Sequence, residues 1–231
     1  IRSMKGIADE ILVVDSHSTD RTEEICRQLG AKFVQHDFKG YGPQKQFAVG
    51  EAAYDWILSL DADEELSEEL RASILEKKNN TEEEMCEEIA YVFPRKNYYC
   101  KKLIRHIGWG HDSKIRLFNR KFANWTNNLV HETVDTSNLK STLTLKGDLK
   151  HYTYNSVEQH EQKTTTYARL AATEIKMSGK RYSQPIILIK AAYRFLLDYF
   201  VKLGILDGYY GFKICQMNAR YVYLKYSGGK E

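Results

Sequence analysis

Two acidic motifs stand out because each directly follows a short apolar segment. Asp15 ends the run Ile11-Leu-Val-Val-Asp, and Asp61 and Asp63 follow Trp56-Ile-Leu-Ser-Leu. Ligands of open parallel sheets bind beyond the carboxyl ends of the strands, so these acids are expected to line one crevice. Carboxylate oxygens suit Mg²⁺ or Mn²⁺ bound to a diphosphate. The alternative is that acids at strand ends only cap the helices that follow.

The elements that must position these acids alternate between strand and helix. Residues 10–15 and 31–34 are apolar and rich in β-branched side chains, and the helical spacing of residues 22–29 lies between them. A strand, helix, strand order predicts a parallel pair. A helix over 44–53 and a buried strand over 56–61 continue the pattern. The N-terminal part therefore reads as an α/β fold.

The second half of the chain has a different character. Ser67 and the glutamates after it predict the start of another helix, and residues 76–88 read as a charged helix or loop. Three short strand candidates follow, at 91–93, 113–118 and 143–145. From Ser156 onward the pattern is helical. We therefore expect a catalytic domain over 1–155 and a helical region over 156–231.

Composition and charge narrow the function classes. The chain has 231 residues, of which 42% are hydrophobic, and this fraction excludes intrinsic disorder. The net charge of +3 is too small to indicate nucleic-acid binding. Residues 51–90 carry a local net charge of −11 and residues 181–231 one of +5, which indicates different partners for the two regions.

The cysteines and the hydropathy profile bear on the compartment. Four cysteines form no CxxC pair, so we expect reduced thiols. No signal peptide is visible, and no run of about 18 uncharged apolar residues occurs. These features predict a cytoplasmic location.

The motif Asp15-Ser-His-Ser-Thr-Asp-Arg-Thr22, followed by Trp56-Ile-Leu-Ser-Leu-Asp-Ala-Asp-Glu64, resembles glycosyltransferase family 2 and its GT-A fold. Three further stretches resemble the bacterial lipopolysaccharide core β-1,4-glucosyltransferases within it: 40–45, 114–120 and 130–134. The resemblance implies a mostly parallel sheet flanked by helices, with a C-terminal helical extension. It also implies an inverting, metal-dependent transfer of a hexose, such as glucose from UDP-glucose, to a lipopolysaccharide core or other lipid-linked glycan.

One departure from the family concerns the beginning of the fold. The family opens with an apolar strand and an Asn-Glu turn, whereas this chain begins where the first helix should be ending. We therefore expect the central sheet to lack its first strand.

The resemblance also implies roles on the donor side. Asp15 would face the base or ribose of the nucleotide, Asp61 the ribose or the metal, and Asp63 the metal itself. His151 would complete the Mg²⁺ or Mn²⁺ site, although a single histidine is more often structural. Lys45 follows a glycine-containing loop and would reach a phosphate, unless it is a solvated surface lysine.

Three residues are candidates for the transfer itself. Arg116 lies in an alternating strand and would neutralise the departing diphosphate. An inverting transfer needs a base near the acceptor hydroxyl, and Glu132 is the candidate by family likeness, unless it is a strand-edge glutamate paired with a lysine. Trp109, between two glycines, would stack on an acceptor sugar or anchor its loop in the core.

The C-terminal region predicts contact with a membrane surface. Within 186–206 the four charged residues Lys190, Arg194, Asp198 and Lys202 are spaced by four and form one stripe on an otherwise apolar helix. Such a helix lies in the interface of an anionic membrane, here the inner face of the bacterial inner membrane, as a peripheral protein. The alternative is packing on the catalytic domain or on a second subunit, as in a homodimer.

Two rival functions remain open at this point. A nucleotidyltransferase would use the same crevice and would need a glycine-rich triphosphate loop near the N-terminus. A catalytically inactive, membrane-associated scaffold would keep the fold alone.

Overall fold

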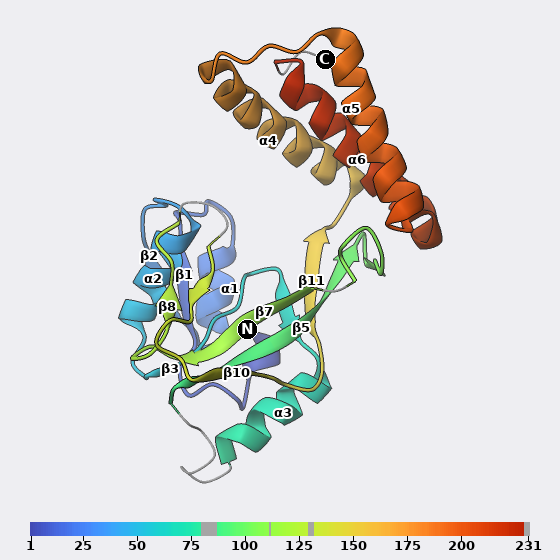
Figure 1. The fold of residues 1–231 in the computed structure, drawn as a ribbon. Coiled ribbons are helices and arrows are strands. Elements are labelled where there is room, and N and C mark those ends of the chain that lie inside the picture. Colours follow the sequence, from blue (N-terminus) through green and yellow to red (C-terminus); the bar gives the residue numbers. More distant parts are fainter. Residues whose placement is uncertain (80–86, 111, 129–131, 229–231) are drawn as a thin grey trace. The chain divides into compact units, whose positions relative to one another are not determined.

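The computed structural model describes residues 1–79, 87–110, 112–128 and 132–228. Outside these ranges lie Val130, His131, Cys86 and most of the charged stretch 76–88. The chain divides into two compact units, and each is treated by itself (Figure 1). Unit 1 comprises 1–95 and 113–150, and unit 2 comprises 96–112 and 151–231. The segment 96–112 thus belongs with the C-terminal helices, although it interrupts unit 1 in the sequence.

The first part of unit 1 forms a β–α–β arrangement. Strand β1 (Leu12–Asp15), helix α1 (Thr22–Gln28) and strand β2 (Lys32–Gln35) follow one another, and β1 and β2 pair in parallel. Gly30 ends the helical segment with φ of 82°, the left-handed conformation that glycine adopts without strain. The predicted parallel pair is therefore confirmed.

Helix α2 (Tyr41–Glu51) begins earlier than the predicted start at Gln44. The expected loop over residues 39–43 is mostly its first turn. Pro43 is tolerated there, because the amide groups of the first turn have no partner within the helix. This earlier start brings Gly42 against the segment around Asn128, and the Gly42 amide donates to the Asn128 carbonyl at 3.0 Å.

A seven-stranded mixed sheet follows, and it confirms the α/β fold class. Its path runs β3–β7–β5–β11–β4, and β6 and β10 pair with β5. The strands are β3 (Trp56–Leu58), β4 (Glu64–Leu66), β5 (Ile89–Tyr99), β6 (Lys102–Leu103), β7 (Asp112–Asn119), β10 (Ser141–Thr144) and β11 (Leu149–Tyr154). Pairing is antiparallel between β3 and β7 and parallel between β10 and β5, so the sheet is less uniformly parallel than expected.

The remaining elements of unit 1 are short or flank the sheets. Helix α3 (Glu68–Asn79) begins after Ser67, whose hydroxyl accepts from the Leu70 amide at 3.2 Å as an N-cap should. A 3₁₀ turn (Arg2–Met4) opens the chain, and β8 (Asn124–Trp125) pairs with β9 (Val134–Asp135).

A cavity of about 1000 Å³ in unit 1 is lined by residues of the β1–β2 sheet and of the seven-stranded sheet. Val13 and Val14 line it from β1, and Ile57 and Leu58 line it from β3. Among the described residues no strand joins β1 to β3, so β1 and β2 form a sheet of their own. Ser16, next to Asp15, and Asp61 line the cavity, but Asp15 and Asp63 are not among its lining residues. Of the three acids expected to line one crevice, only Asp61 lines this cavity.

Unit 2 contains three long helices. They are α4 (Val157–Met177), α5 (Gln184–Leu196) and α6 (Gly208–Tyr226), and α6 contacts both of the others. A π-helical turn (Leu197–Val201) and a 3₁₀ turn (Gly204–Asp207) connect α5 to α6. The predicted helical C-terminal region is confirmed. Within the described part of the chain, no helix combines the length and apolar character needed to cross a bilayer.

Candidate active site

The turn between β3 and β4 carries the second acidic motif. The Glu64 amide donates to the Asp61 carbonyl, and the Asp61 amide donates to Glu64 Oε2, both at 3.0 Å. These reciprocal bonds close the turn and fix the direction of both side chains. Asp63, between them, is exposed at the tip of the turn. Within the segment Asp61-Ala-Asp-Glu64, Asp63 therefore faces outward and Glu64 lies in the interior.

Arg116 lies beneath this turn and binds both of its inner acids. One terminal nitrogen of its guanidinium lies 2.8 Å from Asp61 Oδ2 and 2.7 Å from Glu64 Oε1. The Arg116 and Glu64 side chains are 3% and 0% exposed, so this is a buried ion pair. Arg95 lies 3.3 Å from the same Glu64 oxygen and adds a second positive charge. A buried carboxylate needs such compensation to remain charged.

Lys45 completes the network from helix α2. Its ammonium nitrogen lies 2.8 Å from Asp61 Oδ1 and 2.7 Å from Glu132 Oε1. The Lys45 and Glu132 side chains are only 15% and 16% exposed. Lys45 is thus not the solvated surface lysine of the alternative interpretation. It joins the acid of the β3–β4 turn to the candidate base, and Glu132 is paired with a lysine that belongs to the site.

These charges shift the ionisation of the buried groups. Burial alone would raise the pKa of Asp61, but the positive charges of Arg116 and Lys45 outweigh it and hold that pKa below its usual value. Burial likewise opposes the charged form of Arg116, yet Glu64 and Asp61 raise its pKa. Asp61 is therefore ionised at neutral pH, and its two oxygens contact Lys45 and Arg116.

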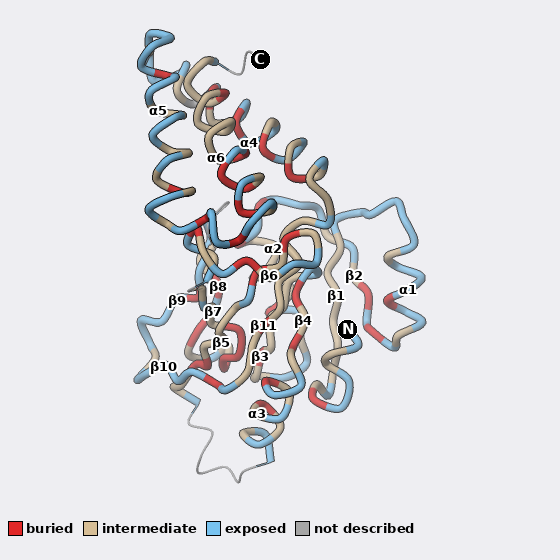
Figure 2. The backbone as a smooth tube through the Cα atoms, turned by 90° about the vertical axis from the view of Figure 1, so that its right-hand side faces the viewer, coloured by how far each residue is buried: buried red, intermediate tan, exposed pale blue. Residues whose placement is uncertain are grey.

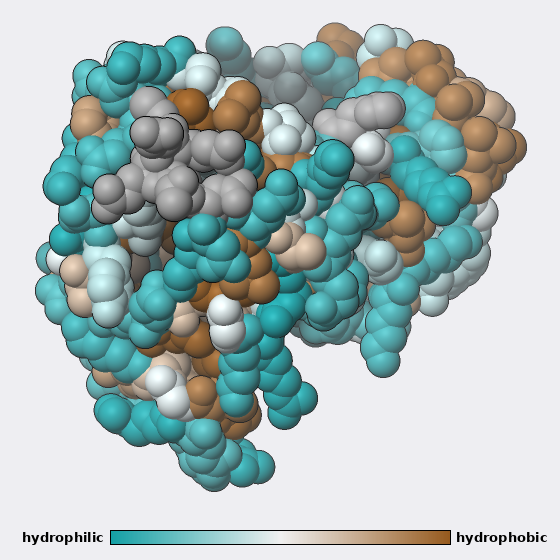
Figure 3. All heavy atoms as spheres, turned by 90° about the horizontal axis from the view of Figure 1, so that it is seen from below, coloured by the Kyte–Doolittle hydropathy of each residue, from teal (hydrophilic) through white to brown (hydrophobic). Residues whose placement is uncertain are grey.

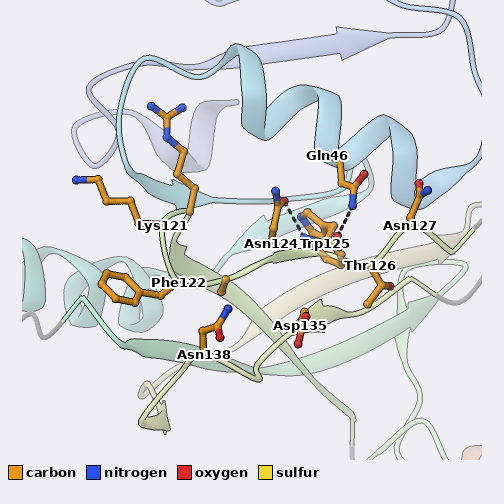
Figure 4. A pocket seen from close by; sticks show the side chains of 11 residues that line it. Gln46, Lys121, Phe122, Asn124, Trp125, Thr126, Asn127, Asp135 and Asn138 are labelled. Atoms are coloured by element: carbon orange, nitrogen blue, oxygen red, sulfur yellow. Dashed lines mark hydrogen bonds between the residues drawn. The ribbon is translucent and has the colours of Figure 1, made fainter.

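Trp125 underlies both cations of the network. The Lys45 ammonium lies 4.3 Å and the Arg116 guanidinium carbon 5.5 Å from the centroid of its ring. Its backbone is held by amide side chains: Gln46 donates to the Trp125 carbonyl at 2.6 Å, and Asn124 accepts from the Trp125 amide at 2.8 Å (Figure 4). The aromatic face thus supports Lys45 without neutralising it.

The same tryptophan lines a second, polar pocket of about 490 Å³ (Figure 4). Amide side chains dominate its wall, including Asn127 and Asn138. Lys121 at its rim is ion-paired with Asp55 at 2.6 Å. The candidate catalytic residues do not line this pocket.

Asp15 ends β1, and its carboxylate is engaged locally. It accepts from the Ser18 amide at 2.7 Å and from the Ser18 hydroxyl at 2.6 Å. The neighbouring Ser16 hydroxyl accepts from Gln44 of α2 at 3.1 Å, so the end of β1 is tied to the helix that carries Lys45. The turn-capping alternative describes the contacts of Asp15, and its contact with a nucleotide stays a prediction.

Two candidates belong to unit 2. His151 Nδ1 lies 2.7 Å from Asn97 Oδ1. Trp109 is half-buried against Tyr99, and its carbonyl accepts from Asn97 at 3.1 Å. Both side chains have structural contacts, and their roles toward metal and acceptor stay predictions.

The acids of the β3–β4 turn are the candidate ligands of a divalent cation. Within the described ranges no three His, Cys, Asp or Glu side chains form a group that could hold a metal by themselves. Both oxygens of Asp61 already face cations, at 2.8 Å from Lys45 and from Arg116. Mg²⁺ commonly takes one or two carboxylates and completes its shell with substrate phosphates, and Asp63 and Asp61 suit that mode.

The sequence analysis missed three members of the network: Glu64, Arg95 and Trp125. One signal for Glu64 was available. In the short strand Glu64-Glu65-Leu66, alternation places Glu64 on the same face as Leu66, which is 1% exposed. An acid on a core face requires a buried cation, and that requirement points to Arg116.

Comparisons with known proteins identify the family. An uncharacterized glycosyltransferase of Rickettsia typhi is 33% identical over 235 residues, covering 92% of this chain and 74% of its own length. One from Rickettsia bellii is 34% identical with the same coverage. A lipopolysaccharide core biosynthesis glycosyltransferase of Rhizobium meliloti is 27% identical, covering 84% of this chain and 74% of its own. The sequence profile named Glycosyl transferase family 2 matches residues 1–139. The chain is therefore a member of glycosyl transferase family 2, with a glycosyltransferase fold and activity.

Proposed function

We propose that this glycosyltransferase is inverting and metal-dependent, and that it moves a hexose, with UDP-glucose as the first donor to test, to a lipopolysaccharide core or other lipid-linked glycan. The observation that carries the proposal is the position of Lys45 between Asp61 and Glu132, at 2.8 and 2.7 Å. Asp61 on the donor side and Glu132, the candidate base, thus both bind the ammonium group of Lys45. The name of the Rhizobium meliloti relative supports the choice of acceptor.

On the donor side, the nucleotide sugar occupies the cavity at the end of β1 and β3. Asp15 and Ser16 face its base and ribose, and Asp61 faces the ribose or the cation. Asp63 and Asp61 would hold the cation, and its chemistry there would be to supply positive charge to the departing diphosphate. Arg116 keeps the turn in place from beneath, and its buried charge adds to the positive potential there.

On the acceptor side, Glu132 accepts the proton of the attacking hydroxyl. In the present arrangement its carboxylate is paired with Lys45 at 2.7 Å. A donor diphosphate carries more negative charge than one carboxylate and competes for the same ammonium group. Binding of the donor thereby draws Lys45 toward the phosphates and releases Glu132 for the acceptor. This order of events links donor binding to activation of the base.

The proposal extends to location. A lipid-linked acceptor lies at a membrane, and we place the enzyme at the inner face of the bacterial inner membrane, as a peripheral protein in the cytoplasm. The chain acts there alone or as a homodimer.

A donor screen tests the proposed reaction. Hydrolysis or transfer of several UDP- and ADP-sugars is measured with Mn²⁺, Mg²⁺ or a chelator, and calorimetry records UDP binding under the same conditions. Asp63→Ala is expected to abolish metal-dependent UDP binding, while Asp37→Ala, an exposed acid outside the turn, leaves it intact. Equal binding of UDP with Mn²⁺ and with chelator would overturn the metal dependence. Absence of binding by any nucleotide favours the inactive scaffold.

A further inference from the structure

Helix α5 exposes an apolar stripe. Its members are Ile186, Ile189, Tyr193 and Leu196, and Phe200 of the following π-helical turn continues it. They recur at spacings of three and four, and each is 46–67% exposed. This spacing places them on one side of the helix. Among the described residues, 12 of the 20 exposed large hydrophobic side chains fall within 186–212. In Figure 2 most residues of α5 are coloured as exposed.

The apolar surface continues around the turn from α5 to α6. This apolar tip consists of Val201, Leu203, Ile205, Leu206 and Tyr209, which are 46–70% exposed. Brown, apolar side chains gather in the space-filling view at the right-hand edge, where the end of α5 lies (Figure 3). The tip closes a helical hairpin, so its apolar side chains project from an end rather than from a flat side.

The charged residues of the same helix face the opposite way. Asp198 is completely buried and accepts from Arg194 at 2.6 Å and from Asn218 of α6 at 2.8 Å. Lys202 lies 3.1 Å from its other oxygen. The predicted charged stripe therefore packs toward α6, and the apolar stripe faces outward. This reverses the arrangement expected of a helix surrounded by water.

The charge of unit 2 indicates what covers this surface. Residues 96–112 and 151–231 carry 16 basic and seven acidic side chains, a net charge of +9, whereas the whole chain carries only +3. Lys213 of α6 lies over the ring of Tyr209 at the tip, 5.7 Å from its centroid. Tyrosine beside lysine suits the headgroup region, where the ring is half in the apolar layer and the cation meets phosphate.

From these observations we infer that the apolar tip and the apolar stripe insert into the interface of an anionic phospholipid bilayer. A convex end fits the deformable surface of a bilayer better than the flat seam of a second copy. The excess of positive charge favours anionic lipid and disfavours pairing of two units of +9. The inference rests on the proposed function in one respect only, because a lipid-linked acceptor explains why contact with a membrane is useful.

The test is co-flotation of the full chain with vesicles, in the absence of any donor. Vesicles are phosphatidylcholine alone or with roughly one third phosphatidylglycerol. The variant Val201→Glu/Leu206→Glu changes two exposed side chains of the tip, and Met177→Glu, at an 82% exposed apolar residue of α4, is the matched control. We expect the tip variant to lose at least about tenfold of its binding to anionic vesicles, and the control to stay within about twofold.

Three outcomes would overturn the inference. One is equal binding of the tip variant and the wild type, and another is equal binding to neutral and anionic vesicles. The third is a dimer in analytical ultracentrifugation that the tip variant dissociates, with no vesicle binding by the wild type; the surface would then join two copies. Transferase activity is assayed separately in detergent. If the wild type has no transferase activity but floats normally with vesicles, the proposed function is contradicted and the inference of a membrane-binding surface is unaffected.

Discussion

The ammonium nitrogen of Lys45 lies 2.7 Å from the carboxylate of Glu132, although 87 residues separate them in the chain. The same nitrogen lies 2.8 Å from Asp61. One ammonium group thus bridges two acids from distant parts of the chain. The proposed reaction can be tested from each member of this network.

Replacing the candidate base should separate chemistry from donor binding. In Glu132→Gln the side chain keeps its size but cannot accept the acceptor proton, so we expect turnover to fall at least about 100-fold while UDP affinity is retained. Steady-state rates and calorimetry on the same preparations measure the two quantities. Glu68→Gln, at a 94% exposed residue of α3, is the control. Near-normal turnover of Glu132→Gln removes Glu132 from the role.

The buried pair beneath the turn should dominate the stability of unit 1. Arg116→Met leaves the fully buried Glu64 with Arg95 alone, at 3.3 Å, and should lower the free energy of unfolding by about 3–5 kcal/mol. The double variant Arg116→Met/Glu64→Gln removes the uncompensated charge and should recover part of that loss. Urea unfolding of the single and double variants measures the coupling. Additive losses would show that the two side chains do not act as a pair.

A glycine permits the close approach that brings Lys45 to its partners. A Cβ at Gly42 would lie 2.3 Å from the Thr126 carbonyl oxygen and 2.5 Å from that of Asn128. Gly42→Ala should therefore displace the start of α2 and cost about 1–3 kcal/mol, with loss of activity. Gly50→Ala in the same helix meets nothing within 4 Å and should stabilise by roughly 0.5–1 kcal/mol. Thermal unfolding compares the two, and equal shifts would refute the steric argument.

Unit 2 should lose stability in mild acid through His160. This histidine is 5% exposed, its Nδ1 lies 3.1 Å from the Tyr99 hydroxyl, and burial lowers its pKa from 6.5 to about 4. Between those pH values the unfolded chain binds the proton and the folded chain does not. The contribution of neutral His160 to the free energy of unfolding is therefore fully present above about pH 6.5. It is lost as the pH drops toward 4, by about 3 kcal/mol in all.

Unfolding free energies of His160→Gln as a function of pH test this expectation. Between pH 4 and 6.5, the free energy of unfolding of His160→Gln should change less with pH than that of the wild type, whatever the absolute stability of the variant. His17→Gln changes a histidine whose side chain is 56% exposed, and it should keep the wild-type slope. An unchanged slope in His160→Gln would assign the acid sensitivity to other groups.

The sequence by itself determined the first elements of the fold and the family. Apolar runs ending in acids identified β1 and β3, and Ser67 identified the start of α3, because hydrophobic periodicity and capping act over a few residues. The start of α2 at Tyr41 was not predictable from local pattern, because contact with the segment around Asn128 stabilises its first turn.

Only the tertiary structure decided which charges meet. Glu64 stands in an acidic run of the sequence, yet it is buried against Arg116 of β7, 52 residues away. Asp198 belongs to the charged stripe that predicted contact with a membrane surface, yet it is buried against α6. Both outcomes depend on which residues a distant element presents. The free energy of a buried charge is set by those partners, and no local pattern contains them.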